Sequence, residues 1–207
     1  MAYNMWDKEP EKLKFDKMSI EQKKLLTENE SFCMLPWIHL HAFPDGRAYP
    51  CCFAQDKFPV GDLNKNSLEE VFNNDKMKKL RSNMLQGIQN KECVKCYDQE
   101  KSGFFSLRFS SNKHFGHNIP LVNGTLPDGN ADFVMKYWDI RFSNLCNMAC
   151  RSCGTWFSSN WYEDHKKITG SPPPHAKIMK VGRTTNDMWE QMLEQFEHTE
   201  QFYFAGG

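Results

Sequence analysis

The sequence lacks any excess of charge and any long run of apolar residues. Its 207 residues include 26 basic and 26 acidic side chains, so the formal net charge at pH 7 is zero. A neutral chain gives no indication of binding to nucleic acid or to an anionic membrane surface. The charged first residues hold no apolar segment of the signal-peptide kind, and no later segment reaches membrane-spanning length. We therefore predict a cytoplasmic protein without nucleic-acid or membrane partners.

Isolated cysteines are absent as well. The eight cysteines fall into three groups, namely Cys33 with Cys51 and Cys52, Cys93 with Cys96, and Cys146 with Cys150 and Cys153. Disulfides do not persist in a reducing compartment, so clustered cysteines there are more often metal ligands or redox groups. A free cysteine is otherwise a small buried hydrophobic residue, and for Cys52 this alternative is as good as a ligand role. The spacing of the other seven favours metal binding.

The first part of the chain is predicted to be a leader followed by a small α+β domain. Residues 1–30 are expected to contain one helix, because Ser19 and Gln22 form a capping box. In residues 31–103, two short strand-prone segments flank the turn formers Pro44-Asp45-Gly46. This pattern predicts a β-hairpin with a cysteine near each end.

One helix and a linker are expected to follow the hairpin. The Ser67–Glu70 capping box opens the helix and Gly87 ends it, shortly before the C-x2-C pair. Residues 104–135 are irregular and rich in turn formers, which predicts a linker or an elaborated loop. This segment is the natural domain boundary.

The last part, residues 136–207, has the pattern of a β/α unit. The segment 133–142 is predicted to be a strand, the cysteine triplet lies in the loop after it, and a helix begins just beyond the triplet. A further helix over about 186–198 and a buried strand over 201–207 follow. The order strand, helix, strand predicts a parallel α/β architecture.

The triplet has the spacing C-x3-C-x2-C, which allows three thiolates to converge on one metal centre. Iron–sulfur clusters are normally held by four cysteines, so three without a fourth nearby indicate a cluster with one open iron. The alternative is a zinc site that a histidine closes, with His165 or His117 as the fourth ligand.

The segment "YWDIRFSNLCNMACRSCG" resembles the radical SAM superfamily, whose members carry this cysteine motif after the first strand of a β/α barrel. The resemblance implies that Cys146, Cys150 and Cys153 bind a [4Fe–4S] cluster whose open iron takes S-adenosylmethionine. It also implies an enzyme in which the reduced cluster cleaves S-adenosylmethionine to a 5′-deoxyadenosyl radical, which then abstracts hydrogen from a substrate. The fold it implies is a TIM-like (β/α) barrel. Ser152 stands where many members carry an aromatic residue near the adenine.

A second part of the resemblance concerns the end of the chain. "YFAGG" is similar to the start of the Gly-Gly-Glu segment that contacts the amino group of S-adenosylmethionine in the family. The resemblance implies that Ala205, Gly206 and Gly207 contact this cofactor. The acidic residue does not follow because the sequence stops, so we expect a barrel truncated after its start. We also expect little or no turnover from this chain alone.

The first half offers four thiols for a second site, from Cys33, Cys51, Cys93 and Cys96. The residues alone leave zinc and iron–sulfur open. The pattern C-x12-G-x4-C with Gly46, the capped helix with Arg81 and "ECVKC" resemble the SPASM or twitch module of radical SAM enzymes. The resemblance implies an auxiliary [4Fe–4S] cluster, with Cys52 as the alternative to Cys51. The module precedes the barrel segment here, whereas it usually follows the barrel.

The expected partners come from the same resemblance. They are a peptide or protein substrate and an electron donor such as flavodoxin or ferredoxin. The alternatives are a non-catalytic iron–sulfur electron-transfer module and a zinc-stabilised binding module. His39 and His41 alternate along a predicted strand and could be ligands on one face, although histidines satisfied in a core are commoner.

Overall fold

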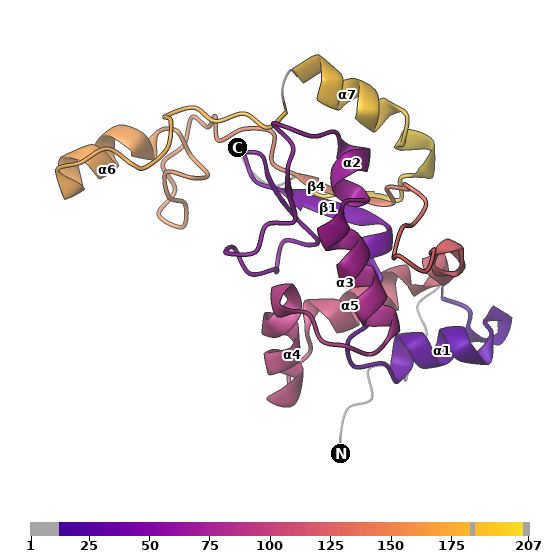
Figure 1. The fold of residues 1–207 in the computed structure, drawn as a ribbon. Helices are drawn as coiled ribbons and strands as arrows, with labels where there is room; N and C mark the ends of the chain where they lie inside the picture. The colour runs from indigo at the N-terminus through magenta and orange to yellow at the C-terminus, as the bar shows by residue number, and fades with distance from the viewer. Residues whose placement is uncertain (1–12, 183–184, 205–207) are drawn as a thin grey trace.

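The protein, in a computed structural model, is described over residues 13–182 and 185–204. Its centre is a five-stranded mixed sheet of β1 (His39–Ala42), β2 (Arg47–Tyr49), β3 (Gly61–Asp62), β4 (Tyr137–Ile140) and β5 (Gln201–Phe202). The strand order is β3-β2-β1-β4-β5. β1 pairs antiparallel with β2 and parallel with β4, and β4 pairs parallel with β5. The result is a mixed α/β fold with a small sheet (Figure 1).

The described residues also form seven α-helices and five 3-10 helices. The α-helices are α1 (Ile20–Thr27), α2 (Leu68–Phe72), α3 (Asp75–Leu85), α4 (Val94–Lys101), α5 (Leu107–Phe115), α6 (Trp161–Thr169) and α7 (Thr185–Leu193). The 3-10 helices are η1 (Phe15–Lys17), η2 (Leu35–Trp37), η3 (Lys91–Cys93), η4 (Gly116–Gly124) and η5 (Phe196–His198). Among the described residues, no helix is both long and apolar enough to span a membrane.

The predicted hairpin and both predicted capping boxes are confirmed. Ser19 and Gln22 cap α1 reciprocally, and Ser67 and Glu70 do the same for α2. Gly46 turns β1 into β2 with φ of 90°, a conformation that favours glycine. A Cβ atom at Gly46 would lie 2.2 Å from Nδ2 of Asn64. The turn therefore needs this glycine for its backbone angle and for its close contact.

The single helix expected after the hairpin is two helices, and this prediction is wrong in that respect. α2 ends at Phe72, and Asn74 begins α3 by accepting hydrogen bonds on its side chain from the N–H groups of Lys76 and Met77. An asparagine competes with the helical backbone in this way, which makes it a helix start and not a helix interior. The predicted end of the helix at Gly87 is confirmed. α3 ends at Leu85, and Gly87 just beyond it has a φ of 75°, which does not continue a right-handed helix.

The segment 104–135 contains helical structure, namely α5 and η4. Asn112 of α5 is buried, accepts a hydrogen bond from the N–H of Met34 at 2.8 Å and donates one to the carbonyl of Phe32 at 3.1 Å. Leu107–Phe115 shows little helical amphipathicity in sequence, and these tertiary hydrogen bonds fix it against the first half of the chain.

The β/α unit after this segment has the predicted order with shorter strands. β4 covers Tyr137–Ile140, and α6 begins at Trp161, eight residues after Cys153. β5 covers two residues, and Phe202 is 39 % exposed, so the prediction of a buried strand there is wrong. Residues 205–207 lie outside the described residues.

The two faces of the sheet differ in chemistry. Leu40 and Trp138 point to one face, which packs into the main apolar core with α2, α3 and α7. His39 and His41 point to the other face, and all four side chains of β1 are buried. Figure 1 shows α6 and its flanking segments projecting away from this central body. The cysteine triplet belongs to this projecting part.

Candidate metal centres

Four of the predicted cysteines line one cavity. Cys33 precedes η2, Cys51 follows β2, and Cys93 and Cys96 lie at the start of α4. The cavity has about 300 Å³ of space between atoms, its mouth included, and Leu35, Phe53, Ala54 and Leu107 complete an apolar wall. The hairpin and α4, which are more than forty residues apart in sequence, thus bring the thiols together.

The surroundings of these thiols disfavour the charged thiolate. Burial raises the pKa of Cys33 to about 12, and it raises the pKa of Cys51 and of Cys93 well above the usual range. The neighbouring cysteines raise the pKa of each of these thiols further, because thiolates repel one another. Four thiolates in this cavity therefore require a positive charge among them, and metal ions supply it.

Backbone N–H groups near the sulfur atoms oppose this effect in part. Those of Leu35, Phe53 and Arg108 act to lower the pKa of Cys33, Cys51 and Cys96. Hydrogen bonds to ligand sulfurs orient them and tune an iron–sulfur cluster. This list of donors was not predicted from the sequence, because backbone N–H groups carry no sequence signal.

Arg108 lines the cavity with Cys96 and pairs with Glu100. The guanidinium group of Arg108 bonds both carboxylate oxygens of Glu100 and donates to the carbonyl of Phe32 at 2.8 Å. This buried pair joins α4 to α5, so the position of Cys96 depends on the segment after the C-x2-C pair. Sequence reasoning missed both residues, since neither belongs to the cysteine pattern.

Cys52 faces away from this cavity. Its side chain is exposed and interacts with the carboxylate of Asp139 on β4, whereas Cys51 lines the cavity. Partial desolvation of the sulfur and the neighbouring carboxylate of Asp139 raise the pKa of the Cys52 thiol. Of the two alternatives at this position, the structure places Cys51 with the other three thiols.

The triplet lies on a loop that Asn144 ties at its base. The buried amide of Asn144 donates to the carbonyls of Thr155 and Lys177, both at 3.1 Å, and accepts from the N–H of Met179 at 2.8 Å. The N–H of Ser159 donates to the carbonyl of Asn144 at 2.8 Å. These hydrogen bonds join both ends of the loop. They give Asn144, two residues before Cys146, a structural role that depends on its side-chain amide.

The triplet thiols are more accessible than the four in the cavity. Cys150 is exposed and Cys146 and Cys153 are half-buried, while Ser152 is exposed. The sulfur of Cys146 accepts a hydrogen bond from the N–H of Met148 at 3.4 Å. An accessible set of three thiols suits a centre that an external ligand must reach.

The two histidines considered as a fourth ligand lie in different places. His165 lines an open hollow with about 390 Å³ of empty space, its mouth included, together with Cys153 and Trp161. His117 forms a hydrogen bond with the carboxylate of Glu200, with 2.7 Å between Nε2 and Oε2. Among the described residues, no three His, Cys, Asp or Glu side chains lie close enough to share one metal ion. The four cysteines of the first half nevertheless line one cavity.

A buried polar face lies between the two cysteine sites. His41 donates from Nδ1 to the carboxylate of Asp139 at 2.9 Å, and His39 donates from Nδ1 to the carbonyl of Tyr137 at 2.9 Å. Within the described chain, both Nε2 atoms, Oδ1 of Asp139 and Nε of Arg141 are buried without a hydrogen-bond partner. Buried polar atoms of this kind normally have a hydrogen-bond partner. Sequence reasoning considered the histidines and missed Asp139 and Arg141.

This polar face contacts the triplet loop. The guanidinium of Arg141 lies 4.4 Å from the ring centre of Phe157, and Phe43 packs on the same ring at 5.8 Å. On the other side, the carboxylate of Asp139 interacts with Cys52, next to a cavity cysteine in the chain. The face therefore connects the surroundings of the two sites.

Comparison with known proteins gives one family match. Residues 33–97, about a third of the chain, match the SPASM iron–sulfur cluster-binding domain. No curated protein and no solved structure matches the chain. The matched segment contains all four cysteines of the cavity. Its match indicates that this part of the chain binds an iron–sulfur cluster, as domains of this kind in radical SAM enzymes do.

Proposed function

We propose that the protein is a radical SAM enzyme with one closed and one open [4Fe–4S] centre. The observation that carries the proposal is the contrast between the two cysteine sets. Four thiols line a buried cavity, and three accessible thiols lie on a tied loop directly after a parallel strand. A closed set suits a structural or electron-transfer cluster, and an open set suits a cluster that binds a further ligand.

In the closed centre, Cys33, Cys51, Cys93 and Cys96 would hold the cluster. Their donor chemistry fits it, because all four are sulfur ligands, and backbone N–H groups near three of the sulfurs favour the thiolate form. The apolar wall excludes water, which protects a cluster from hydrolysis and oxidation. The pair Arg108–Glu100 holds α4 in position beside it.

In the open centre, Cys146, Cys150 and Cys153 would hold three irons and leave the fourth to S-adenosylmethionine. When reduced, such a cluster supplies the electron that cleaves S-adenosylmethionine to methionine and a 5′-deoxyadenosyl radical. The chain's own task is to orient the cofactor, and Trp161 offers an aromatic surface in the cavity beside Cys153. This surface would replace the aromatic residue that Ser152 does not provide.

The buried polar face would meet the substrate side of the open centre. His41 is oriented by Asp139, and its Nε2 atom is left to accept a hydrogen bond. Arg141 adds a cation at the base of the triplet loop. These groups suit a peptide or protein substrate, whose amides both donate and accept hydrogen bonds. A protein such as flavodoxin or ferredoxin would supply the electron.

The proposed architecture is the start of a β/α barrel joined to the SPASM-like segment. Its support is the parallel pairing of β4 with β5 through the connection that carries α6 and α7. Parallel strands with helical crossovers are the building unit of such barrels. The triplet then occupies the loop at the carboxyl end of β4, where ligands bind in this architecture.

Anaerobic reconstitution with iron and sulfide tests the proposal. The wild-type chain should bind about eight irons, and the Cys146→Ala/Cys150→Ala/Cys153→Ala variant about four. S-adenosylmethionine should change the electron paramagnetic resonance spectrum of the reduced wild type and leave that of the variant unchanged. Stoichiometric zinc without sulfide-dependent absorbance would contradict the proposal and favour a zinc site, for which His165 beside Cys153 is the available ligand.

A further inference from the structure

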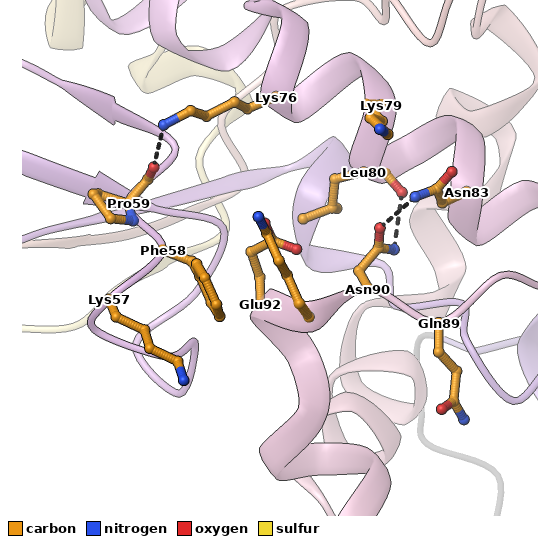
Figure 2. Close-up of a pocket in the computed structure, with 11 residues that line it drawn as sticks. Lys57, Phe58, Pro59, Lys76, Lys79, Leu80, Asn83, Gln89, Asn90 and Glu92 are labelled. Carbon is orange, nitrogen blue, oxygen red and sulfur yellow. Dashed lines mark hydrogen bonds between the residues drawn. The ribbon is translucent and has the colours of Figure 1, made fainter.

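A pocket rich in lysine lies apart from both cysteine sites. Lys57, Lys76, Lys79 and Lys91 line it, with Glu92 as the one carboxylate (Figure 2). It has about 950 Å³ of empty space, its open mouth included. The lysines come from three segments, namely the loop after the hairpin, α3 and η3. Although the net charge of the whole chain is zero, four lysine side chains thus surround one pocket.

The charges of these lysines are not neutralised by carboxylates. Elsewhere Lys78 pairs with Asp128 at 2.9 Å and Lys177 with Glu163 at 3.1 Å. Over the described ranges, none of the four pocket lysines forms an ion pair. All four are exposed. An anionic ligand that enters the pocket therefore does not have to displace a carboxylate from any of the four ammonium groups.

Uncharged groups hold three of the ammonium groups in place. Those of Lys57 and Lys91 lie 5.1 Å and 4.5 Å from the ring centre of Phe58, and Lys76 donates to the carbonyl of Pro59 at 2.8 Å. Contacts with a ring and a carbonyl orient a lysine and leave its full charge. The pocket is thus partly ordered before a ligand arrives.

The arrangement of the lysines favours several separate anionic groups. Figure 2 shows Lys76 and Lys79 along α3 and Lys57 at another edge, with Phe58 and Leu80 between them. A single phosphate needs donors that converge on one point. Carboxylates spaced along an extended peptide match separated lysines better, and apolar surface between them suits the peptide's other side chains.

The pocket has no lining residue in common with the four-thiol cavity, but residues of both follow one another in the chain. Lys91 and Glu92 directly precede Cys93 in η3, and the N–H of Gln55 donates to the carbonyl of Glu92 at 3.1 Å. The segment 51–58 carries a cavity cysteine at one end and Phe58 at the other. A ligand in the pocket is therefore held next to the cavity.

We propose that this pocket binds an acidic segment of a protein partner through its Asp and Glu carboxylates. The proposal goes beyond cluster binding, and its test needs no cluster. A fluorescently labelled peptide that alternates glutamate and glycine is titrated with the full chain and followed by anisotropy. The matched peptide has glutamine in place of glutamate. The glutamate peptide should bind, and its affinity should fall as salt is added, while the glutamine peptide should not bind.

Matched variants locate the binding. The Lys57→Gln/Lys79→Gln/Lys91→Gln variant should bind the glutamate peptide at least about tenfold more weakly. The Lys17→Gln/Lys24→Gln/Lys166→Gln variant removes the same charge from exposed positions elsewhere and should change affinity by less than about twofold. Equal thermal unfolding of the two variants verifies that both remain folded. The proposal is overturned if the glutamate peptide does not bind, if both variants weaken it equally, or if inorganic phosphate at equal ionic strength binds more tightly than the peptide.

Discussion

Cys51 and Cys52 are neighbours in the chain with opposite surroundings. The Cys51 side chain lines the four-thiol cavity, and the Cys52 side chain is exposed beside Asp139. Of these two adjacent thiols, only that of Cys51 lines the cavity. A substitution at Cys52 is therefore a matched control for the same substitution at Cys51.

Replacing each of these cysteines in turn is expected to give different results. Cys51→Ser should lower bound iron after reconstitution from about eight to about four per chain, because the closed cluster loses a ligand. Cys52→Ser should leave the iron content unchanged. Iron and sulfide analysis of both proteins checks this. The opposite result, with Cys52→Ser losing iron, would show that the cavity is not the cluster site.

His39 is expected to make stability depend on pH. Burial lowers the pKa of His39 to about 4, against about 6.5 when unfolded, and the hydrogen bond to Tyr137 opposes this only in part. Between about pH 4 and pH 6.5, the unfolded state therefore binds more protons at this histidine than the folded state does. Stability should be full above about pH 6.5 and should fall by on the order of 3 kcal/mol as the pH is lowered to about 4.

Urea unfolding at several pH values measures this effect. His39→Asn cannot titrate and should lose this part of the pH slope. The exposed His114→Asn is the control and should keep the wild-type slope. An unchanged slope in His39→Asn would mean that His39 is not buried in its neutral form.

At the scale of elements, Arg81 of α3 joins its own helix to η2 and to α2. Its side chain is buried, lies 4.2 Å from the ring centre of Phe72, and donates to the carbonyls of Pro36 and Phe72 at 2.8 Å. It also donates to Oδ1 of Asn73 at 2.9 Å, at the break between α2 and α3. Arg81 thus fixes the angle at which the two helices meet.

Removing the guanidinium group should destabilise the protein strongly. Arg81→Met keeps most of the volume but leaves the carbonyls buried and unpaired, at a cost of about 3 kcal/mol in the free energy of unfolding. Lys79→Met, an exposed position on the same helix, should change it by less than about 0.5 kcal/mol. Denaturant unfolding compares the two. A similar small effect for both would show that the Arg81 hydrogen bonds add little.

At the scale of the whole molecule, the two cysteine sites share one sheet. β1 from the SPASM-like segment pairs with β4 of the segment that carries the triplet, with His39 opposite Tyr137 and Ala42 opposite Ile140. The His41–Asp139 pair crosses the same junction. The domain boundary predicted over 104–135 therefore separates two segments that are hydrogen-bonded to each other.

This shared sheet predicts that the first segment does not fold alone. A fragment of residues 1–103 would lose the partner strand of β1 and the Asp139 partner of His41, and the core on the Leu40 face would lose Trp138 and α7. We expect no cooperative unfolding transition for the fragment and a single transition for the whole chain, both measured by circular dichroism. A fragment with a sharp transition and a well-dispersed NMR spectrum would instead favour two independent domains.

The sequence by itself determined the local features of this protein. Capping boxes, the Gly46 turn and the cysteine spacings depend on residues close together in the chain, whose bonding geometry is the same in any fold. The sequence did not reveal the helix break at Asn74 or helix α5, since competing local and tertiary hydrogen bonds decide them.

Only the tertiary structure decided what lies together. It placed Cys51 and not Cys52 with Cys33, Cys93 and Cys96. It also paired β1 with β4 and so brought His41 to Asp139, almost a hundred residues away. Such contacts depend on strand register and on packing between distant segments, which no local pattern of residues encodes.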